Sequence, residues 1–303
     1  MNHSTQTLFA LITLVSGLLK ISLVEAEPKK FIAEISETFQ TFDARQGVAV
    51  DAGQFYAVNN VRITRHEKRT GAAELQWDGG YEFKGPLDHL DSGMVWQGRL
   101  YAAHSNYPFL PMTSSVEIWD TRTMAHVASH NFGILLGSMT WLDRYRGEWW
   151  GAFANYDKVQ DGTDTPYGGT HNTVVVRMDD EFQVLQNWTL PDELVGRMKP
   201  MSNSGGSWGP DDLLYLTGHD YPEIYVVRPP VTGSQLEWVA TVEVAGLNGQ
   251  GIAWDRSVEA RDLWAILKQQ ELVFRIRMPE IASHLEPANV NTMIRSPDNF
   301  ALD

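Results

Sequence analysis

"SGMVWQGRLYAA", residues 92–103, is an apolar stretch that turns at 97–98 and runs back. Apolar, aromatic-containing runs on both sides of a short turn with Gly are typical of a β-hairpin. Its flanks are polar, with His89 and Asp91 at the start and "HSNY" at 104–107. The stretch predicts a hairpin with an apolar middle and two polar ends on the same side.

The pattern recurs four more times along the chain. The other copies are "QGVAVDAGQFYAV" from Gln46, "GSMTW…EWWGAF" from Gly137, "SGGSWGPDDLLYLT" from Ser204 and "QGIAWDRSVEARDLWAI" from Gln250. Aligned on their small residues, the copies begin at Gly47, Gly93, Ser138, Gly205 and Gly251, at intervals of 46, 45, 67 and 46 residues. A period of this length indicates a repeat architecture.

Each copy continues into a third apolar run, and most copies into a fourth. Four short strands in about 45 residues are the signature of a propeller blade. We therefore predict an all-β fold, a five-bladed β-propeller, with six blades as the alternative. The long interval predicts an inserted surface loop around 157–172, rich in Asp, Gly and Thr. That insertion follows one of the polar strand ends and is a candidate lid.

The last copy lacks a fourth strand, whereas an unassigned strand, "FIAEISETFQTF", precedes the first copy at 31–42. A strand from the N-terminus that completes the last blade would close the ring and remove open sheet edges. We therefore expect residues 27–303 to form a single β-propeller domain.

Residues 1–26 are predicted to be a signal peptide. The apolar run 8–19 is too short to span a membrane and suits a signal-peptide core. Val24 and Ala26 supply small residues at the two positions that a signal peptidase reads. We expect cleavage after Ala26, a secreted or periplasmic location, and no membrane span elsewhere.

Composition narrows the classes of partner. The net charge of −14 disfavours nucleic acid, which is gripped by Lys and Arg. The absence of Cys excludes disulfides, thiol nucleophiles and thiolate metal sites. We expect a monomer whose partner is a small-molecule, carbohydrate or peptide ligand. Asn187 begins an Asn-Trp-Thr tripeptide that fits the glycosylation acceptor pattern.

In a propeller, the first strand of each blade lines the channel and the second returns to the same face. The starts of the first strands and the ends of the second strands should therefore meet at one surface, here called the entry mouth. Their residues are nearly all hydrogen-bonding or titratable, whereas the opposite turns, "DAGQ", "QGR", "GPDD" and "RSVEARD", are simple turn formers. Loops are polar in general, but this asymmetry places the candidate site at the entry mouth.

The candidate catalytic residues at the entry mouth are His104, His219, Lys268 and Asp91. Histidine titrates near neutral pH and suits general acid–base work, with an aspartate to orient its ring. Lys268 would act as a base or hold a substrate carboxylate. The alternatives are hydrogen-bonding histidines and a solvated lysine.

The predicted substrate-binding side chains are amides, carboxylates and tyrosines. They are Gln46, Asn60, Asn106, Tyr107, Asn155, Tyr156, Asp220, Tyr221, Gln250 and Gln269. The tyrosines would stack on a sugar or an aromatic ring, or else pack against the next blade. His89 is the candidate metal ligand beside the other histidines, with zinc or calcium as the ion considered. No compact metal-binding motif accompanies it.

Two strings, "AHSNYPFLPMTSSVEIWD" and "GGSWGPDDLLYLTGHDYPEIYVVRPP", resemble stretches of a widespread group of exported bacterial propeller proteins. This resemblance implies the fold and export, and no reaction. "RQGVAVDAGQFYAV" and "LNGQGIAWD…RDLWAI" are similar, more loosely, to the plant-type glutaminyl cyclases, which are five-bladed propellers. The third copy, "LLGSMTWLD", lacks the Glu-Gly-Trp-Gly string of those enzymes, so no catalytic residue is transferred from them.

Three functions fit the sequence. The first is an enzyme, a hydrolase, lyase or cyclase acting on a small polar substrate by His/Asp/Lys acid–base chemistry, with or without a metal. The second is a ligand-binding or protein-interaction propeller without catalysis, and the third is a scaffold in an envelope complex. Because propellers host all of these, the distances among the candidate residues decide between them.

Overall fold

A computed structural model describes residues 28–80, 85–160 and 163–285 of the chain. The predicted signal peptide, 1–26, lies outside the described residues, as do 161–162 of the predicted insertion. The described part contains one α-helix, α1 (Asp192–Met198), and three short 3₁₀ turns, η1 (Thr170–Asn172), η2 (Lys268–Gln270) and η3 (Ala282–His284). None of its helices has the length and apolar character needed to cross a bilayer.

Three four-stranded antiparallel sheets follow one another along the chain, each a meander of consecutive strands. The first contains β2 (Gly47–Val50), β3 (Gln54–Val58), β4 (Arg62–Glu67) and β5 (Ala73–Asp78). The second contains β6 (Leu90–Trp96), β7 (Arg99–Ser105), β8 (Ser114–Asp120) and β9 (His126–Gly133). The third contains β10 (Ser138–Tyr145), β11 (Glu148–Ala154), β12 (Val174–Met178) and β13 (Val184–Thr189).

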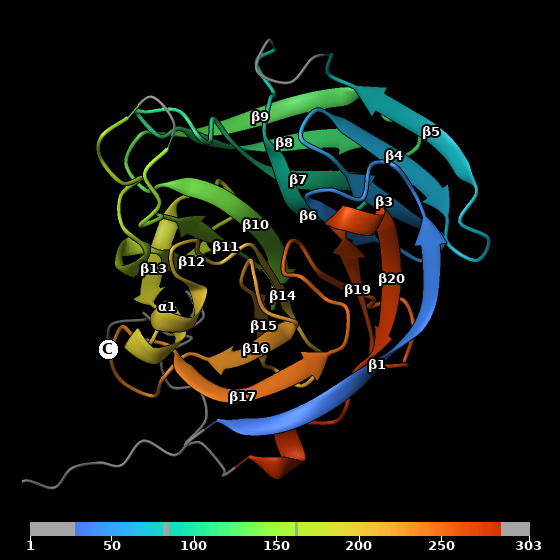
Figure 1. The fold of residues 1–303 in the computed structure, drawn as a ribbon. Helices are drawn as coiled ribbons and strands as arrows, with labels where there is room; N and C mark the ends of the chain where they lie inside the picture. The colour runs from blue at the N-terminus through green and yellow to red at the C-terminus, as the bar shows by residue number, and fades with distance from the viewer. Residues whose placement is uncertain (1–27, 81–84, 161–162, 286–303) are drawn as a thin grey trace, which may run out of the picture.

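An eight-stranded sheet holds the remaining strands in the order β14-β15-β16-β17-β1-β20-β19-β18. They are β14 (Gly205–Trp208), β15 (Leu214–Thr217), β16 (Glu223–Arg228), β17 (Glu237–Val244), β1 (Lys29–Gln40), β20 (Leu272–Arg277), β19 (Asp262–Leu267) and β18 (Ala253–Trp254). The sheets surround a common centre (Figure 1). There β2 contacts β6, β6 contacts β10, β10 contacts β14, β14 contacts β18, and β18 contacts β2. Four-stranded meanders around an axis are the architecture of a β-propeller, which confirms the predicted all-β propeller class.

The predicted strand at 31–42 is observed as β1, which lies between the edges of two strand groups. Its second half, Glu34 to Gln40, pairs antiparallel with β20, the last strand of the fifth repeat. Its first half, Lys29 to Ala33, pairs in parallel with β17, the last strand of the fourth repeat. The sequence predicted the first pairing and not the second.

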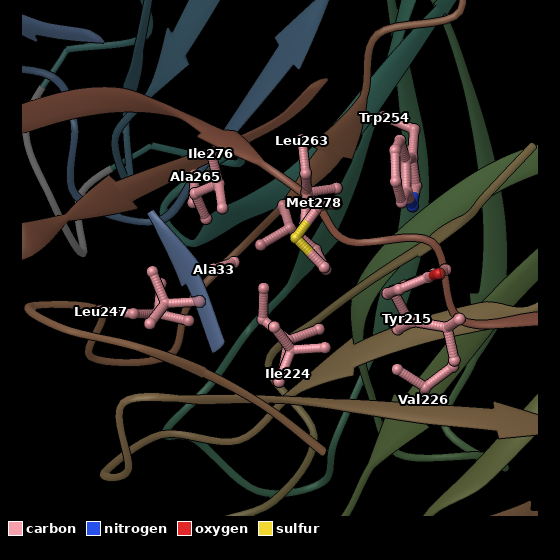
Figure 2. Packing of buried hydrophobic residues seen from close by; sticks show 14 of the residues in the cluster. Ala33, Tyr215, Ile224, Val226, Leu247, Trp254, Leu263, Ala265, Ile276 and Met278 are labelled. Carbon is pink, nitrogen blue, oxygen red and sulfur yellow. The ribbon is translucent and has the colours of Figure 1, made fainter. Parts of the chain in front are cut away.

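The core lies between neighbouring strand groups rather than in one central mass. Figure 2 shows one cluster, in which Ala33 of β1 lies among side chains that include Ile224 of β16 and Ala265 of β19. Trp141, Trp208 and Trp254, which recur at one place in three of the inner strands, belong to such clusters, and Trp208 stacks 4.1 Å from the Tyr145 ring. Trp96 differs because it is only half-buried.

The inner strands approach so closely at the axis that a side chain larger than hydrogen does not fit at some repeat starts. A Cβ atom on Gly251 would lie 2.6 Å from the Ser92 hydroxyl and 2.7 Å from Gly47 Cα. A Cβ atom on Gly205 would lie 2.8 Å from Gly251 Cα. The repeated small residue that reveals the period is therefore required by space in the ring.

Replacing Gly251 by Ala should lower the free energy of unfolding by about 1–3 kcal/mol, the usual cost of overpacking. Gly53→Ala is the matched control, since no atom lies within 4 Å of its added Cβ, and should change stability by less than about 1 kcal/mol. Urea denaturation of both variants measures the difference. Equal stability of the two variants would contradict the close approach.

Candidate functional site

His89 and Asp91 face each other at the start of β6, with His89 Nε2 3.5 Å from Asp91 Oδ2. Lys268, at the start of η2, is near enough for its charge to lower the pKa of both residues. The charge of His104, at the end of β7, also acts on His89. Four residues singled out by the sequence are therefore brought together from two repeats.

Burial dominates the titration of the His89–Asp91 pair. Burial lowers the pKa of His89 to about 3, and the charges of His104 and Lys268 act in the same direction. Burial raises the pKa of Asp91 well above its usual value, although Lys268 opposes the shift. Because burial disfavours charge, both side chains are driven toward their neutral forms, and His89 is an uncharged imidazole at neutral pH.

His104 is buried, with a hydrogen-bonded serine on one side of its ring and a carboxylate near the other. Its Nδ1 lies 2.9 Å from Ser115 Oγ on the neighbouring strand β8. Its buried Nε2 has no hydrogen-bond partner among the described residues and lies 3.6 Å from Asp88 Oδ1. Burial lowers the pKa of His104, whereas the charges of Glu117 and Asp88 raise it.

Three tyrosines form a wall beside His89. The Tyr107 ring lies 5.2 Å from the His89 ring, 5.0 Å from Tyr156 and 5.4 Å from Tyr167. Tyr156 and Tyr167 are buried, so their rings pack within the protein. For Tyr156, such packing was the alternative to stacking on a ligand. Tyr107 is half-buried, and its hydroxyl accepts a hydrogen bond of 2.7 Å from Gln160 Nε2.

The predicted insertion supplies Gln160 and Tyr167, two residues that the sequence analysis did not select. Asp157 fixes this segment by accepting a 2.8 Å hydrogen bond from Thr170 N and by pairing with Lys199 at 2.9 Å. His171 is exposed. The described part of the insertion is therefore packed against the tyrosine wall, and the lid stays a prediction.

Gln46, Asn60 and Gln250 lie where the first, fourth and fifth repeats meet. Gln46 Nε2 donates to Asn60 Oδ1, and Gly251 N donates to the Gln46 carbonyl at 2.9 Å. The Gln250 carbonyl accepts a 2.6 Å hydrogen bond from Thr217 Oγ1. These contacts join the strand starts at the axis.

Two predicted binding amides are used inside the protein. Asn106 spans its own loop, donating to the Pro111 carbonyl at 2.8 Å and accepting from Thr113 N at 2.7 Å. Asn155 Nδ2 donates to the carbonyls of Leu136 and Asn172. Both amides support loops, so we do not carry them forward as ligand contacts.

A more exposed group follows β15, the second strand of the fourth repeat. His219 Nδ1 lies 2.8 Å from Asp220 Oδ1, and the exposed Tyr221 ring lies 4.4 Å below the Arg197 guanidinium. His219 is not among the residues whose charges lower the pKa of His89. Lys268 is half-buried and Gln269 is exposed.

Metal binding was one of the uses considered for His89. Across residues 28–80, 85–160 and 163–285, no three His, Asp or Glu side chains are grouped so that they would hold one ion. We therefore carry neither zinc nor calcium into the proposal below.

A cavity of about 540 Å³ lies at the opposite end of the inner strands and is here called the far-end cavity. Its lining residues are Val50, Asp51, Met94, Val95, Trp96, Asp143, Arg144, Gly147, Ala253, Trp254, Arg256 and Ser257. Arg256 is fixed by two hydrogen bonds to Asp143, of 2.7 and 2.6 Å, and the Arg144 guanidinium lies 4.0 Å above the Trp96 ring. The sequence predicts only simple turns at this end, and it gives no sign of the cavity.

No protein-family model matches the chain, and no curated protein matches its sequence. The resemblances to exported bacterial propellers and to glutaminyl cyclases therefore remain predictions.

Several solved structures are similar in fold. One is the PQQ-bound form of aldose sugar dehydrogenase from Streptomyces coelicolor, with 14% identity, 85% of this chain and 84% of that chain covered, and a TM-score of 0.46. A second is the RRP9 WD40 repeats, with 12% identity, coverage of 77% and 79%, and a TM-score of 0.43. A third is the Cps50 (Swd1) β-propeller domain of Myceliophteria thermophila, with 9% identity, coverage of 82% and 100%, and a TM-score of 0.45. At these scores, the likenesses say nothing about activity.

Replacing Lys268 by Gln should raise the pKa of His89 above about 3, because a repelling cation is removed. The pKa should stay below the ordinary 6.5, since burial, the larger cause, remains. An unfolded histidine titrates at its ordinary pKa, so His89 costs the wild type stability as the pH falls from 6.5 toward 3. The variant should lose less stability over this window.

Histidine NMR titration and melting temperatures across this pH range measure both effects. Lys30→Gln, on exposed β1, is the matched control. A His89 pKa that is the same in both variants would show that Lys268 does not act on this histidine.

Proposed function

We propose that the entry mouth is the active site of an enzyme that acts on a small polar substrate by acid–base chemistry. The observation that carries the proposal is the convergence of His89, Asp91, His104 and Lys268, with His104 Nε2 buried and without a hydrogen-bond partner among the described residues. Perturbed titratable groups gathered in one place are typical of active sites.

The groups suggest a division of roles. The uncharged Nε2 of His104 would accept a proton, and general-base catalysis of this kind contributes about 10²–10⁴-fold in rate. Lys268, the nearby cation, would stabilise negative charge on a substrate oxygen. The half-buried Tyr107 offers an aromatic edge to the substrate body. A carbonyl compound such as a lactone or amide, cleaved or cyclised, fits these roles best.

The test is a substrate screen with lactones, glycosides and peptides that begin with glutamine. For any substrate that is turned over, His104→Asn should reduce kcat by about 100-fold or more. His130→Gln is the control, because His130 packs against Phe132 and Phe182. Full activity of a folded His104→Asn protein would remove His104 from the reaction.

A binding function without catalysis is the second candidate, favoured by the far-end cavity. Its volume suits a small organic ligand. Asp143 already accepts hydrogen bonds from Ser207, Trp208 and Arg256. Arg144 pairs with Asp180 through Nη2, whereas its Nη1 is buried and has no hydrogen-bond partner among the described residues. Val50, Met94 and Val95 supply apolar wall. We propose a small carboxylate with an apolar body as this ligand.

Thermal-shift and calorimetric titration with a panel of small carboxylates test the second candidate. Arg144→Gln should weaken binding at least about tenfold, the loss of one charge-assisted hydrogen bond. Arg146→Gln, at an exposed arginine paired with Asp212, should leave affinity unchanged. If no carboxylate raises the melting temperature, the second candidate is wrong.

The number of blades and the location of the protein are also proposals. We propose a ring of five blades, in which the eight-stranded sheet is two blades joined through β1. The order of contacts among the inner strands and the pairing of β1 with β20 support this count. The apolar run 8–19 and the small residues Val24 and Ala26 support export as a secreted or periplasmic monomer.

A further inference from the structure

A chain of hydrogen bonds runs from His104 across the second sheet to its outer strand. Ser115 Oγ lies 2.9 Å from His104 Nδ1 and donates to Glu117 Oε1 at 2.6 Å. The other carboxylate oxygen, Oε2, accepts from Ser129 Oγ and lies 2.7 Å from His126 Nε2. Glu117 is buried whereas His126 is exposed, so the chain connects the entry mouth to the rim.

This chain determines which nitrogen of His104 carries the proton. A serine hydroxyl has one hydrogen, and here it is donated to the Glu117 carboxylate. Ser115 Oγ must therefore act as an acceptor toward His104, so Nδ1 carries the hydrogen. In the neutral ring, the lone pair is then on Nε2. This buried atom has no hydrogen-bond partner among the described residues, and it faces the Asp88 carboxylate, with Oδ1 3.6 Å away.

A similar network in the first sheet has a buried carboxylate but an asparagine in place of the histidine. Asp43 there accepts hydrogen bonds from Asn59, Arg62, Thr64 and Gln76. Thr64 is paired with Ala57 in the first sheet, and Glu117 is paired with Ala102 in the second. Asn59 and His104 each lie two residues after the paired alanine, so they occupy equivalent positions. An asparagine is therefore sufficient to complete a buried network at this position, and the second sheet instead carries a titratable ring.

We propose that Glu117 is a positioning residue for His104. Acting through Ser115, it holds the ring with the proton on Nδ1 and leaves Nε2 to accept a proton from a substrate at the entry mouth. The inference rests on the proposed function for its chemistry, but the tautomer itself is measurable without any substrate. In catalytic triads a buried carboxylate fixes the histidine tautomer by a direct hydrogen bond to Nδ1–H; here Ser115 lies between the two groups.

Nitrogen-15 NMR of histidine-labelled full-length protein tests the proposal, with the His104 signals assigned by their loss in His104→Gln. The wild type should show the Nδ1–H tautomer at neutral pH. Ser115→Ala and Glu117→Ala should abolish this preference. Glu117→Gln keeps an acceptor for Ser115 but removes the charge that raises the pKa of His104, so it should keep the tautomer and lower that pKa further.

Asp43→Asn is the matched control, since it disrupts the first-sheet network and should lower the melting temperature without changing the His104 tautomer. A wild-type Nε2–H tautomer, or the Nδ1–H tautomer retained in Ser115→Ala, would overturn the proposal. If Glu117→Ala does not fold, Ser115→Ala and Glu117→Gln decide the matter. The proposed tautomer together with full activity of His104→Asn would instead identify the proposed function as the part that fails.

Discussion

The close approach of the inner strands at the axis is the constraint on which the molecule depends. A Cβ atom added to Gly47 or Gly251 would collide with Ser92, and one added to Gly205 would collide with Gly251. Strands this close leave no open channel at these positions, so the loops that follow them gather over a closed floor. The polar residues at strand ends from different repeats are therefore near enough for the charge of Lys268 to act on His89 and Asp91.

The closed floor also explains the unusual electrostatics of the entry mouth. Packed against the floor and the tyrosine wall, His89 and Asp91 lose solvation, and loss of solvation disfavours charge. The titration of these residues follows from the same packing that closes the ring. The far end differs, because there Arg256 and Asp143 remain as a hydrogen-bonded ion pair beside a cavity.

The repeat made the propeller predictable. Its period corresponds to one blade, its small residue to the close approach of the inner strands, and its apolar runs to the strands. It also indicated that His89, Asp91, His104 and Lys268 would lie together. It did not reveal that the Asn106 and Asn155 side chains donate hydrogen bonds to backbone carbonyls. The identity of a residue does not say which group its side chain will bind. The sequence "SSVEIWD" carries a weak signal of the Glu117 network, because Ser115 and Glu117 are two residues apart and therefore lie on the same face of the strand. The far-end cavity left none, since its arginines lie beside ordinary turn residues.

The placement of β1 has a consequence for the order of folding. This strand is synthesised before every repeat, yet its pairing partners β17 and β20 come from the last two repeats. The ring is therefore completed only when nearly the whole chain exists, and contacts of such large sequence separation form slowly. Because β1 already exists when β17 and β20 are made, closure of the ring waits for β20, the last of the described strands.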